Sequence, residues 1–256
     1  MTRPIDFLRA LGWRTSTWLA LTAAFVATAG AAAALAVTTE DVTQHNGLST
    51  SDPSHLRFFI DHRSELLVDL AKLVTELGAA PLLAVLALAT AFVLWWRGAR
   101  VIVSVAPMIA LGLAGVAASV AKQLVGRSRP PMALRLVSET EPSFPSGHAT
   151  DSAAFYVALG LIVAVFVLRR PLSRVLAVAG AFVIAGCIGL SRLILGVHWP
   201  TDVLAGWALG TTTALVVVVA VTGLSRVTPP TNEGARLRLR LLHLLHARRP
   251  LGLRAV

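Results

Sequence analysis

The chain has 256 residues, of which 55% are hydrophobic and only 14% are charged, and its mean hydropathy is +0.72. This composition excludes an ordinary soluble domain and is typical of a protein embedded in a membrane. The formal net charge of +10 is weak evidence for nucleic-acid binding, because that function needs basic residues interleaved with aromatic ones on a soluble face. We therefore expect membrane lipids as partners, and no nucleic acid.

Six stretches are apolar over about 20 residues, the length that crosses a bilayer as a helix. They lie near residues 17–37, 79–96, 101–121, 149–168, 175–195 and 203–223. The predicted fold class is all-α, an integral membrane bundle of six transmembrane helices. The first stretch also resembles a secretory signal, since three arginines precede it and small residues follow at 34–36, but its length favours a retained helix. Cys187, the only cysteine, is predicted to be a small buried residue of the fifth span.

The distribution of basic residues predicts the orientation of the chain. Fifteen of the 23 Lys and Arg residues fall in segments 1–16, 97–100, 169–174 and 224–256, which together carry only two acidic residues. The positive-inside rule places these segments, and with them both termini, in the cytoplasm. The predicted organisation is a cytoplasmic N-terminus over 1–16, a six-span membrane domain over 17–223 and a basic cytoplasmic tail over 224–256.

An outer loop, residues 38–78, connects the first two spans and contains a predicted amphipathic helix. Pro53-Ser54 supplies a start signal, and apolar residues recur at three- and four-residue spacing from Phe59 to Leu77. We interpret it as a connecting helix on the outer surface with one solvated face. A lid or an entry ramp for substrate is the alternative function of such a helix.

Three polar clusters lie at the ends of spans, where ionisable residues are costly and therefore informative. They are Lys122 to Pro130, Pro145 to His148, and Ser191-Arg192 together with His198 to Asp202. All three fall between the third and fourth spans or between the fifth and sixth spans. Counting crossings from a cytoplasmic N-terminus puts them on the outer face, so segments spread over residues 122–202 can form one pocket.

The cations of this pocket indicate its ligand. Lys122, Arg129 and Arg192 suit a group with several anionic oxygens, because Arg offers a planar fork of donors and Lys a point charge. Ser146 and Gly147 stand where a helix begins, so unpaired backbone N–H groups and the positive end of the helix dipole point to the same place. A phosphate group fits this set best.

Two histidines are available for phosphoryl and proton transfer. His198 and Asp202 are one helical turn apart, so the carboxylate can accept from one imidazole nitrogen and leave the other free to attack phosphorus. His148 can then protonate the departing oxygen. Asp151 has two interpretations: it tunes His148, or, as we prefer, it is a stabilising carboxylate in the first turn of a helix.

Each cluster also has a purely structural explanation. Pro-Ser-Gly-His is a common helix start, Asp202 suits the first turn of a helix, and Lys122 and Arg129 can snorkel at a helix end. These explanations do not account for three clusters that occur together, in order and on one side, and this coincidence favours a functional site. Arg127 and Arg135, in the same outer loop, are expected to extend the positive field without a required catalytic role.

These residues resemble the signature of the type 2 phosphatidic acid phosphatase superfamily, which also includes soluble acid phosphatases and vanadium-dependent haloperoxidases. The family pattern is Lys-x6-Arg-Pro, then Pro-Ser-Gly-His, then Ser-Arg-x5-His-x3-Asp, and every position of it is present. The matching residues are Lys122, Arg129, Pro130, Pro145, Ser146, Gly147, His148, Ser191, Arg192, His198 and Asp202. The motifs are highly specific although they span only residues 122–202.

The resemblance implies a helical bundle in which His198 forms a phosphohistidine, Asp202 orients it and His148 is the general acid. It further implies that the phosphoryl oxygens are held by Lys122, Arg129, Ser146, Gly147 and Arg192. No metal and no cofactor is implied. We therefore expect an integral membrane phosphatase, in a bacterial-type plasma membrane, that hydrolyses the terminal phosphate of a lipid phosphate or lipid pyrophosphate at the non-cytoplasmic face.

Two other functions fit the same residues. A vanadium-dependent haloperoxidase would hold vanadate with the same cations and histidine, but relatives of that kind are soluble and larger. A non-catalytic lipid-phosphate transporter or binding protein would have no need for a nucleophile, an acid and an orienting carboxylate together. The motifs select only the phosphate, so phosphatidic acid, phosphatidylglycerol phosphate, diacylglycerol pyrophosphate and polyprenyl pyrophosphate all fit. The sequence indicates no oligomeric state.

Overall fold

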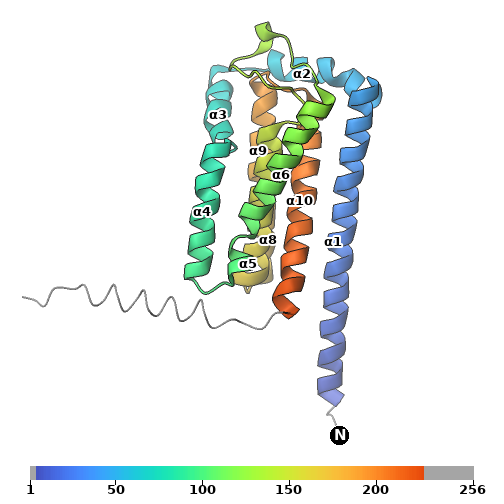
Figure 1. Cartoon of the computed structure of the whole chain (residues 1–256), viewed down its shortest axis with the longest axis vertical. Coiled ribbons are helices and arrows are strands. Elements are labelled where there is room, and N and C mark those ends of the chain that lie inside the picture. The colour runs from blue at the N-terminus through green and yellow to red at the C-terminus, as the bar shows by residue number, and fades with distance from the viewer. Residues whose placement is uncertain (1–3, 228–256) are drawn as a thin grey trace, which may run out of the picture.

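The computed structural model describes the backbone of residues 4–227 and the side chains of residues 22–225, and this part of the chain is helical, without strands. The elements in chain order are α1 (Pro4–Gln44), η1 (Gly47–Ser51), α2 (Asp52–Asp61), α3 (Glu65–Glu76), α4 (Ala80–Trp96), α5 (Val101–Ser104), α6 (Ala106–Val125), η2 (Met132–Leu134), α7 (Gly147–Ser152), η3 (Ala153–Val157), α8 (Ala158–Ile162), η4 (Val163–Val167), α9 (Pro171–Ile194) and α10 (Pro200–Val227). The long helices run side by side along one axis (Figure 1). Most of the predicted basic tail lies outside the described residues.

Within the described residues, five helical segments are long and apolar enough to cross a membrane, or six if the bent pair α3–α4 is one span. The five are Thr22–Gln44, Ala106–Val125, Gly147–Val167, Pro171–Ile194 and Pro200–Ser225. The third of them is continuous from α7 to η4, and η3 and η4 within it are π-helical turns. The prediction of an all-α membrane bundle is confirmed.

Proline and glycine set several helix ends. Pro81, Pro107 and Pro171 stand in the first turns of α4, α6 and α9, where a missing N–H breaks no helical hydrogen bond. Gly126 ends α6 in the left-handed conformation, with φ of 60°, and its N–H bonds to Lys122 O at 3.0 Å. The first polar cluster therefore begins where α6 stops.

The centre of the bundle is α10, which contacts α1, α6, α7 and α9. The buried faces are rich in alanine, as in Ala106 and Ala110 of α6 and Ala214 of α10, and small side chains let membrane helices pack closely. Many large apolar side chains point outward, as expected where the surrounding solvent is lipid. Cys187 is among the exposed residues of α9, so the prediction that it is buried is wrong.

Two glycines bring α10 against the start of α7, backbone to backbone. A Cβ added at Gly206 would lie 2.8 Å from Ser146 O, and one at Gly210 would lie 2.2 Å from Thr150 O. The Ser146 N–H also donates to Asp202 O at 3.0 Å. These contacts hold the helix that carries Asp202 against the helix that carries the second cluster.

The segment predicted as one amphipathic helix is two helices, and they run in different directions. Ser64 starts α3 anew, because its Oγ accepts from Leu67 N at 3.2 Å as an N-cap. In Figure 1, α2 lies across the end of the bundle, whereas α3 runs along it and meets α4 at a bend of 51°. Along α3, Ala71 and Thr75 are buried and Leu73 is exposed.

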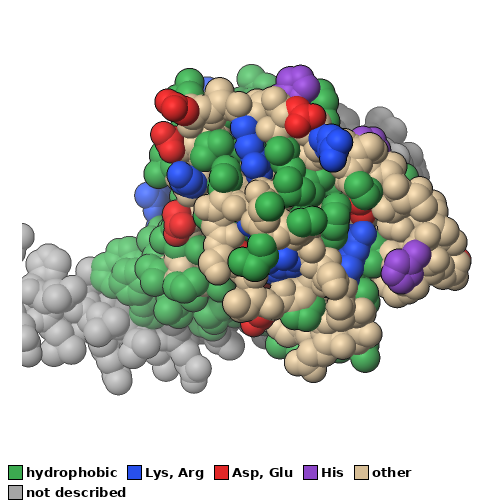
Figure 2. All heavy atoms as spheres, turned by 90° about the horizontal axis from the view of Figure 1, so that it is seen from above, with side chains coloured by type: hydrophobic (Ala, Val, Ile, Leu, Met, Phe, Trp, Pro, Cys, Tyr) green, Lys and Arg blue, Asp and Glu red, His purple; other side chains and the backbone are tan. Residues whose placement is uncertain are grey.

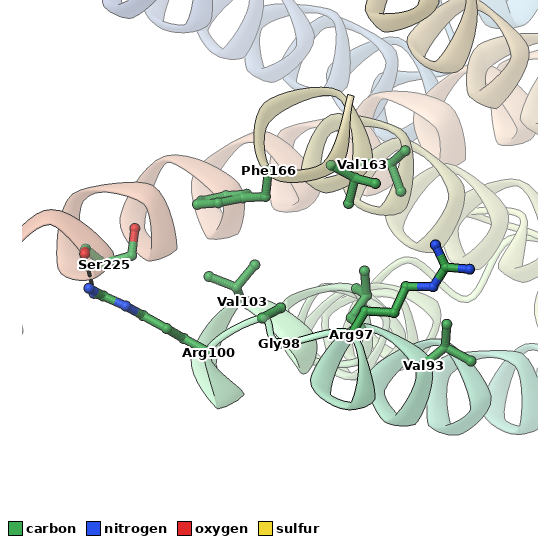
Figure 3. A pocket seen from close by; sticks show the side chains of 11 residues that line it. Val93, Arg97, Gly98, Arg100, Val103, Val163, Phe166 and Ser225 are labelled. Atoms are coloured by element: carbon green, nitrogen blue, oxygen red, sulfur yellow. Dashed lines mark hydrogen bonds between the residues drawn. The ribbon is translucent and has the colours of Figure 1, made fainter. Parts of the chain in front are cut away.

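A cavity of about 870 Å³ lies between α4, α5, η4 and the end of α10 (Figure 3). Its lining is mainly apolar, with Val103 and Phe166 among the residues, and Arg100 in its wall donates to Ser225 O. None of the predicted site residues lines it. Cavity size therefore does not locate the chemistry of this protein.

Candidate active site

The three polar clusters meet at one end of the bundle. The first follows the end of α6, the second opens α7, and the third lies where α9 ends and α10 begins (Figure 1). Figure 2 looks onto this end, where basic and acidic side chains gather among hydrophobic ones. Residues 122–202 thus reach one place from four helix ends.

His198 lies in the turn between α9 and α10 and is only 1% exposed. Its Nε2 is 3.1 Å from Arg129 Nη1, and its Nδ1 is 3.3 Å from Asp202 Oδ2. A guanidinium can only donate, so Nε2 must be the unprotonated acceptor and Nδ1 carries the proton that Asp202 accepts. Burial lowers the pKa of His198 to about 4, against the opposing effect of Asp202, so the imidazole is neutral near pH 7.

Asp202 is completely buried, and both of its oxygens have partners. Besides His198, its Oδ2 accepts from Trp199 N at 2.8 Å and from the Ser143 hydroxyl. Its Oδ1 accepts from Arg127 Nη1 at 2.6 Å. The carboxylate is therefore fixed in orientation from several directions.

The motif cations are held by the loop that joins α6 to α7. Lys122 Nζ donates to Pro142 O at 2.5 Å, and Arg129 Nε donates to Glu141 O at 2.7 Å. Arg129 Nη1 also donates to Val197 O at 2.8 Å, in the turn that precedes His198. The loop thus holds both cations, and it places Arg129 beside the imidazole.

Glu139 of the same loop lies against two motif arginines. Arg192 Nη2 donates to Glu139 Oε1, and Arg129 Nη2 is 3.6 Å from Glu139 Oε2. Burial alone would raise the pKa of Glu139, but Arg192 and Arg129 outweigh it and hold this pKa below its usual range. An anionic group therefore already contacts the arginines that the motifs assign to an anion.

Two buried donors of the site have no partner in the described structure. They are the Ser146 hydroxyl and Arg192 Nε, although Arg192 Nη1 donates to Thr75 Oγ1 at 2.8 Å. A buried polar group without a partner is costly and calls for an explanation such as an absent ligand. Apart from its chain neighbours and its own helix backbone, no atom lies within 4 Å of the place where a Cβ on Gly147 would be, so there is space next to Ser146.

The remaining motif residues have distinct positions. His148 is the second residue of α7, and its Cδ2 would lie 3.4 Å from a Cβ on Gly78. Ser191 Oγ donates to Ile188 O at 2.6 Å within its own helix. Pro130 O accepts from Arg135 Nε at 2.7 Å, so Arg135 braces the loop.

Asp151 lies toward α6, where its Oδ1 would be 3.7 Å from a Cβ on Gly115 and has no hydrogen-bond partner. The structure gives no contact between this carboxylate and His148. Its role stays a prediction.

Several residues of the site were not predicted from the sequence. They are Asp52, Thr75, Glu139 and Ser143, and each acts through a contact that no local pattern reveals. Arg127, expected to extend the positive field, is instead neutralised by two carboxylates, Asp52 and Asp202. An acidic residue at the start of α2 was the only available signal for Asp52.

Comparisons with known proteins agree with this geometry. Residues 103–226 match the PAP2 superfamily. Phosphatidylglycerophosphatase B of Bacillus subtilis (strain 168) is 43% identical over 93 residues, which are 36% of this chain and 44% of that protein. Decaprenylphosphoryl-5-phosphoribose phosphatase of Mycobacterium tuberculosis (strain CDC 1551 / Oshkosh) is 35% identical over 99 residues, which are 38% of this chain and 49% of that protein. The matched regions are less than half the length of either relative.

A solved structure is similar over a larger region. The transmembrane PAP2 type phosphatidylglycerolphosphate phosphatase of Bacillus subtilis superposes with a TM-score of 0.69, covering 80% of this chain and 98% of that chain at 24% identity. At this identity the likeness concerns the fold. The family match over residues 103–226 and the shared fold agree, and this chain is similar in sequence and fold to transmembrane proteins of the PAP2 superfamily.

Proposed function

We propose that this protein is a membrane phosphatase that removes the terminal phosphate of a lipid phosphate or lipid pyrophosphate through a phosphohistidine on His198. The observation that carries the proposal is that two motif residues, Ser146 and Arg192, each have a buried donor without a partner in the described structure, Ser146 Oγ and Arg192 Nε, while the His198 imidazole is neutral. A phosphoryl group supplies the acceptor oxygens that both donors lack. The named relatives, all phosphatases of phosphorylated lipids by their names, support the same class of reaction.

The first step is attack by His198 Nε2 on phosphorus. Asp202 keeps the proton on Nδ1, so Nε2 has a lone pair that can attack phosphorus once Arg129, which donates to Nε2 in this structure, turns to the phosphoryl oxygens. As the N–P bond forms, the P–O bond to the leaving group breaks, and His148 gives its proton to the departing oxygen. In this step the phosphoryl oxygens displace the Glu139 carboxylate and bind Arg129 and Arg192 in its place.

The second step releases the product. Water attacks the phosphorus of phosphohistidine, and His148 takes a proton from that water. The N–P bond breaks, orthophosphate leaves, and His198 returns to its neutral form. Lys122, Gly147 and the start of α7 complete the set of groups that stabilise the charge of the transferring phosphoryl group.

We also propose how the chain is oriented in the membrane and which residues form its membrane domain. The basic residues at 97–100 and 169–174 favour a cytoplasmic position for the end of the bundle opposite the site. With the six-span count, this puts both termini in the cytoplasm and the site on the non-cytoplasmic face. The span domain is 17–223, and a lipid substrate reaches the site from the outer leaflet.

The decisive experiment measures phosphate release by the purified protein and by the His198→Ala variant. The panel contains phosphatidic acid, phosphatidylglycerol phosphate, diacylglycerol pyrophosphate and polyprenyl pyrophosphate. Wild-type protein should release phosphate, whereas folded His198→Ala should release none, because it lacks the imidazole that Asp202 orients for attack. Brief reaction with a substrate labelled in the phosphate should leave acid-labile label on the wild-type protein only.

Normal turnover by folded His198→Ala removes the mechanism. Binding of these lipids without release of phosphate would instead identify a lipid-phosphate binding protein. Oxidation of halide in the presence of added vanadate would identify a haloperoxidase.

A further inference from the structure

An ion pair between the buried Asp52 and the partly buried Arg127 adjoins Asp202. Asp52 opens α2, is 1% exposed, and its Oδ2 is 2.6 Å from Arg127 Nη2. Its Oδ1 accepts from Thr201 N at 3.0 Å, and its Oδ2 accepts from Thr201 Oγ1 at 2.5 Å. Asp52 lies outside residues 103–226, the region that matches the family. The outer segment thus contributes a charge to the core of the site.

Arg127 connects this pair to the carboxylate that holds the imidazole. Its Nη1 donates to Asp202 Oδ1 at 2.6 Å and to Thr201 Oγ1 at 2.8 Å, and its guanidinium lies 5.8 Å from the centre of the Trp199 ring. The two oxygens of Asp202 are therefore divided. Oδ1 accepts from Arg127, whereas Oδ2 accepts from His198, from Trp199 N and from the Ser143 hydroxyl.

We propose that Asp52 and Arg127 are positioning residues that fix the orientation of Asp202 and set how strongly its Oδ2 attracts the Nδ1 proton of His198. The inference rests on the proposed function, in which His198 is the nucleophile. The Arg127 guanidinium bridges two carboxylates, because Nη1 binds Asp202 Oδ1 and Nη2 binds Asp52 Oδ2, each at 2.6 Å. Asp52 binds the second nitrogen of the same guanidinium, Arg127 Nη2. It also accepts from the backbone N–H of Thr201, the neighbour of Asp202.

Removal of Arg127 and removal of Asp52 should have opposite effects on the protonation of His198. The charged or titratable groups that face His198 are Asp202 of α10, Arg129 of the loop after α6, Arg192 of α9 and His148 of α7. Removing the positive charge of Arg127 leaves Asp202 less compensated, so it stabilises the protonated imidazole more. Removing the negative charge of Asp52 gives Asp202 the full effect of Arg127, so it stabilises the protonated imidazole less.

The experiment compares kcat, KM and the acidic limb of the pH profile of kcat/KM for wild type, Arg127→Gln, Asp52→Asn and the double variant. The acidic limb should shift to higher pH by about 0.5 to 1 pH unit in Arg127→Gln and to lower pH in Asp52→Asn, because the lost charges have opposite signs. It should return toward the wild-type position in the double variant. In each variant kcat should fall about 10- to 100-fold, the range for partners that orient a reacting group.

KM should change little, since neither residue contacts the phosphate donors. Arg57→Gln and Asp61→Asn are matched controls, because both side chains are exposed on the same helix α2. These controls should keep wild-type kinetics.

The design separates this inference from the proposed function. If wild-type protein releases no phosphate, or if folded His198→Ala is active, the proposed function itself is wrong. If both behave as expected but the limbs stay in place or move in the same direction, the positioning inference is overturned and the pair only anchors α2. Should Arg127→Gln fail to fold, Arg127→Lys gives the answer: it keeps the charge and must show a lowered kcat with an unmoved limb.

Discussion

The partners of single residues determine which imidazole nitrogen reacts. Arg129 has only donors to offer, so it selects the tautomer of His198 in which Nε2 keeps its lone pair. Asp202 accepts the proton on the other nitrogen, and the Ser143 hydroxyl and Trp199 N–H fix that carboxylate. In the proposed mechanism, the imidazole therefore has its reactive tautomer before a phosphate binds.

A pH profile tests this preparation. Because burial lowers the pKa of His198 to about 4, the imidazole stays neutral and nucleophilic until the pH falls to that value. We expect kcat/KM to hold down to about pH 5 and then to fall about tenfold per pH unit below the pKa. The measurement is phosphate release after brief exposure to each pH, with return to pH 7 as the control for irreversible unfolding. An acidic limb near 6.5, the ordinary histidine value, contradicts the expectation.

Inhibitors test the set of cations. Vanadate adopts the five-coordinate geometry of phosphoryl transfer, and Lys122, Arg129 and Arg192 supply the positive charge that a metal supplies elsewhere. Vanadate at micromolar to millimolar concentration should therefore inhibit phosphate release, and a metal chelator should leave it unchanged. Loss of activity in chelator that added magnesium restores would contradict the assignment.

At the scale of elements, periodicity predicted the spans but not their breaks. Apolar length alone located the long helices, because lipid imposes that length on each of them. The apolar spacing runs on across Ser64, so it gave no sign that an N-cap there separates α2 from α3. The phosphate-binding set stays a prediction, made from the types and spacing of the motif residues. Asp52 and Thr75 were missed because their partners, Arg127 and Arg192, lie far away in the sequence.

A glycine substitution tests the contact between α10 and α7. A Cβ at Gly210 would lie 2.2 Å from Thr150 O, a backbone atom that cannot move aside without shifting α7. Gly210→Ala should therefore destabilise the protein by about 1 to 3 kcal/mol and lower phosphate release. Thermal unfolding in detergent measures the first effect. The control is Gly223→Ala on the same helix, which has open space at its Cβ position and should lose nothing.

At the scale of the whole molecule, charge and function are separated along the bundle axis. The polar clusters gather at one end of the bundle. The short basic segments lie at the other end, where 97–100 joins α4 to α5 and 169–174 leads from η4 into α9 (Figure 1). A lipid phosphate keeps its headgroup at the membrane surface, so the site can serve only the leaflet that it faces. The orientation of the chain therefore decides which leaflet supplies the substrate.

Thiol labelling tests this orientation. In a Cys187→Ala background, a cysteine at the exposed Ser138 should react with an impermeant reagent in spheroplasts. A cysteine at the exposed Arg170 should react only after the membrane is permeabilised, which also shows that the position is accessible. The reverse pattern would place the pocket in the cytoplasm.

The bond from Ser146 N–H to Asp202 O, with Gly206 and Gly210 packed beneath it, links the two helix starts that carry the reacting groups. Opening the site therefore means separating backbones at the centre of the bundle, and local and global opening draw on the same contacts. The Ser146 amide should exchange with deuterated solvent only as slowly as the most protected core amides. Heat inactivation and loss of helical signal should share one midpoint, so that the protein has no folded but inactive intermediate.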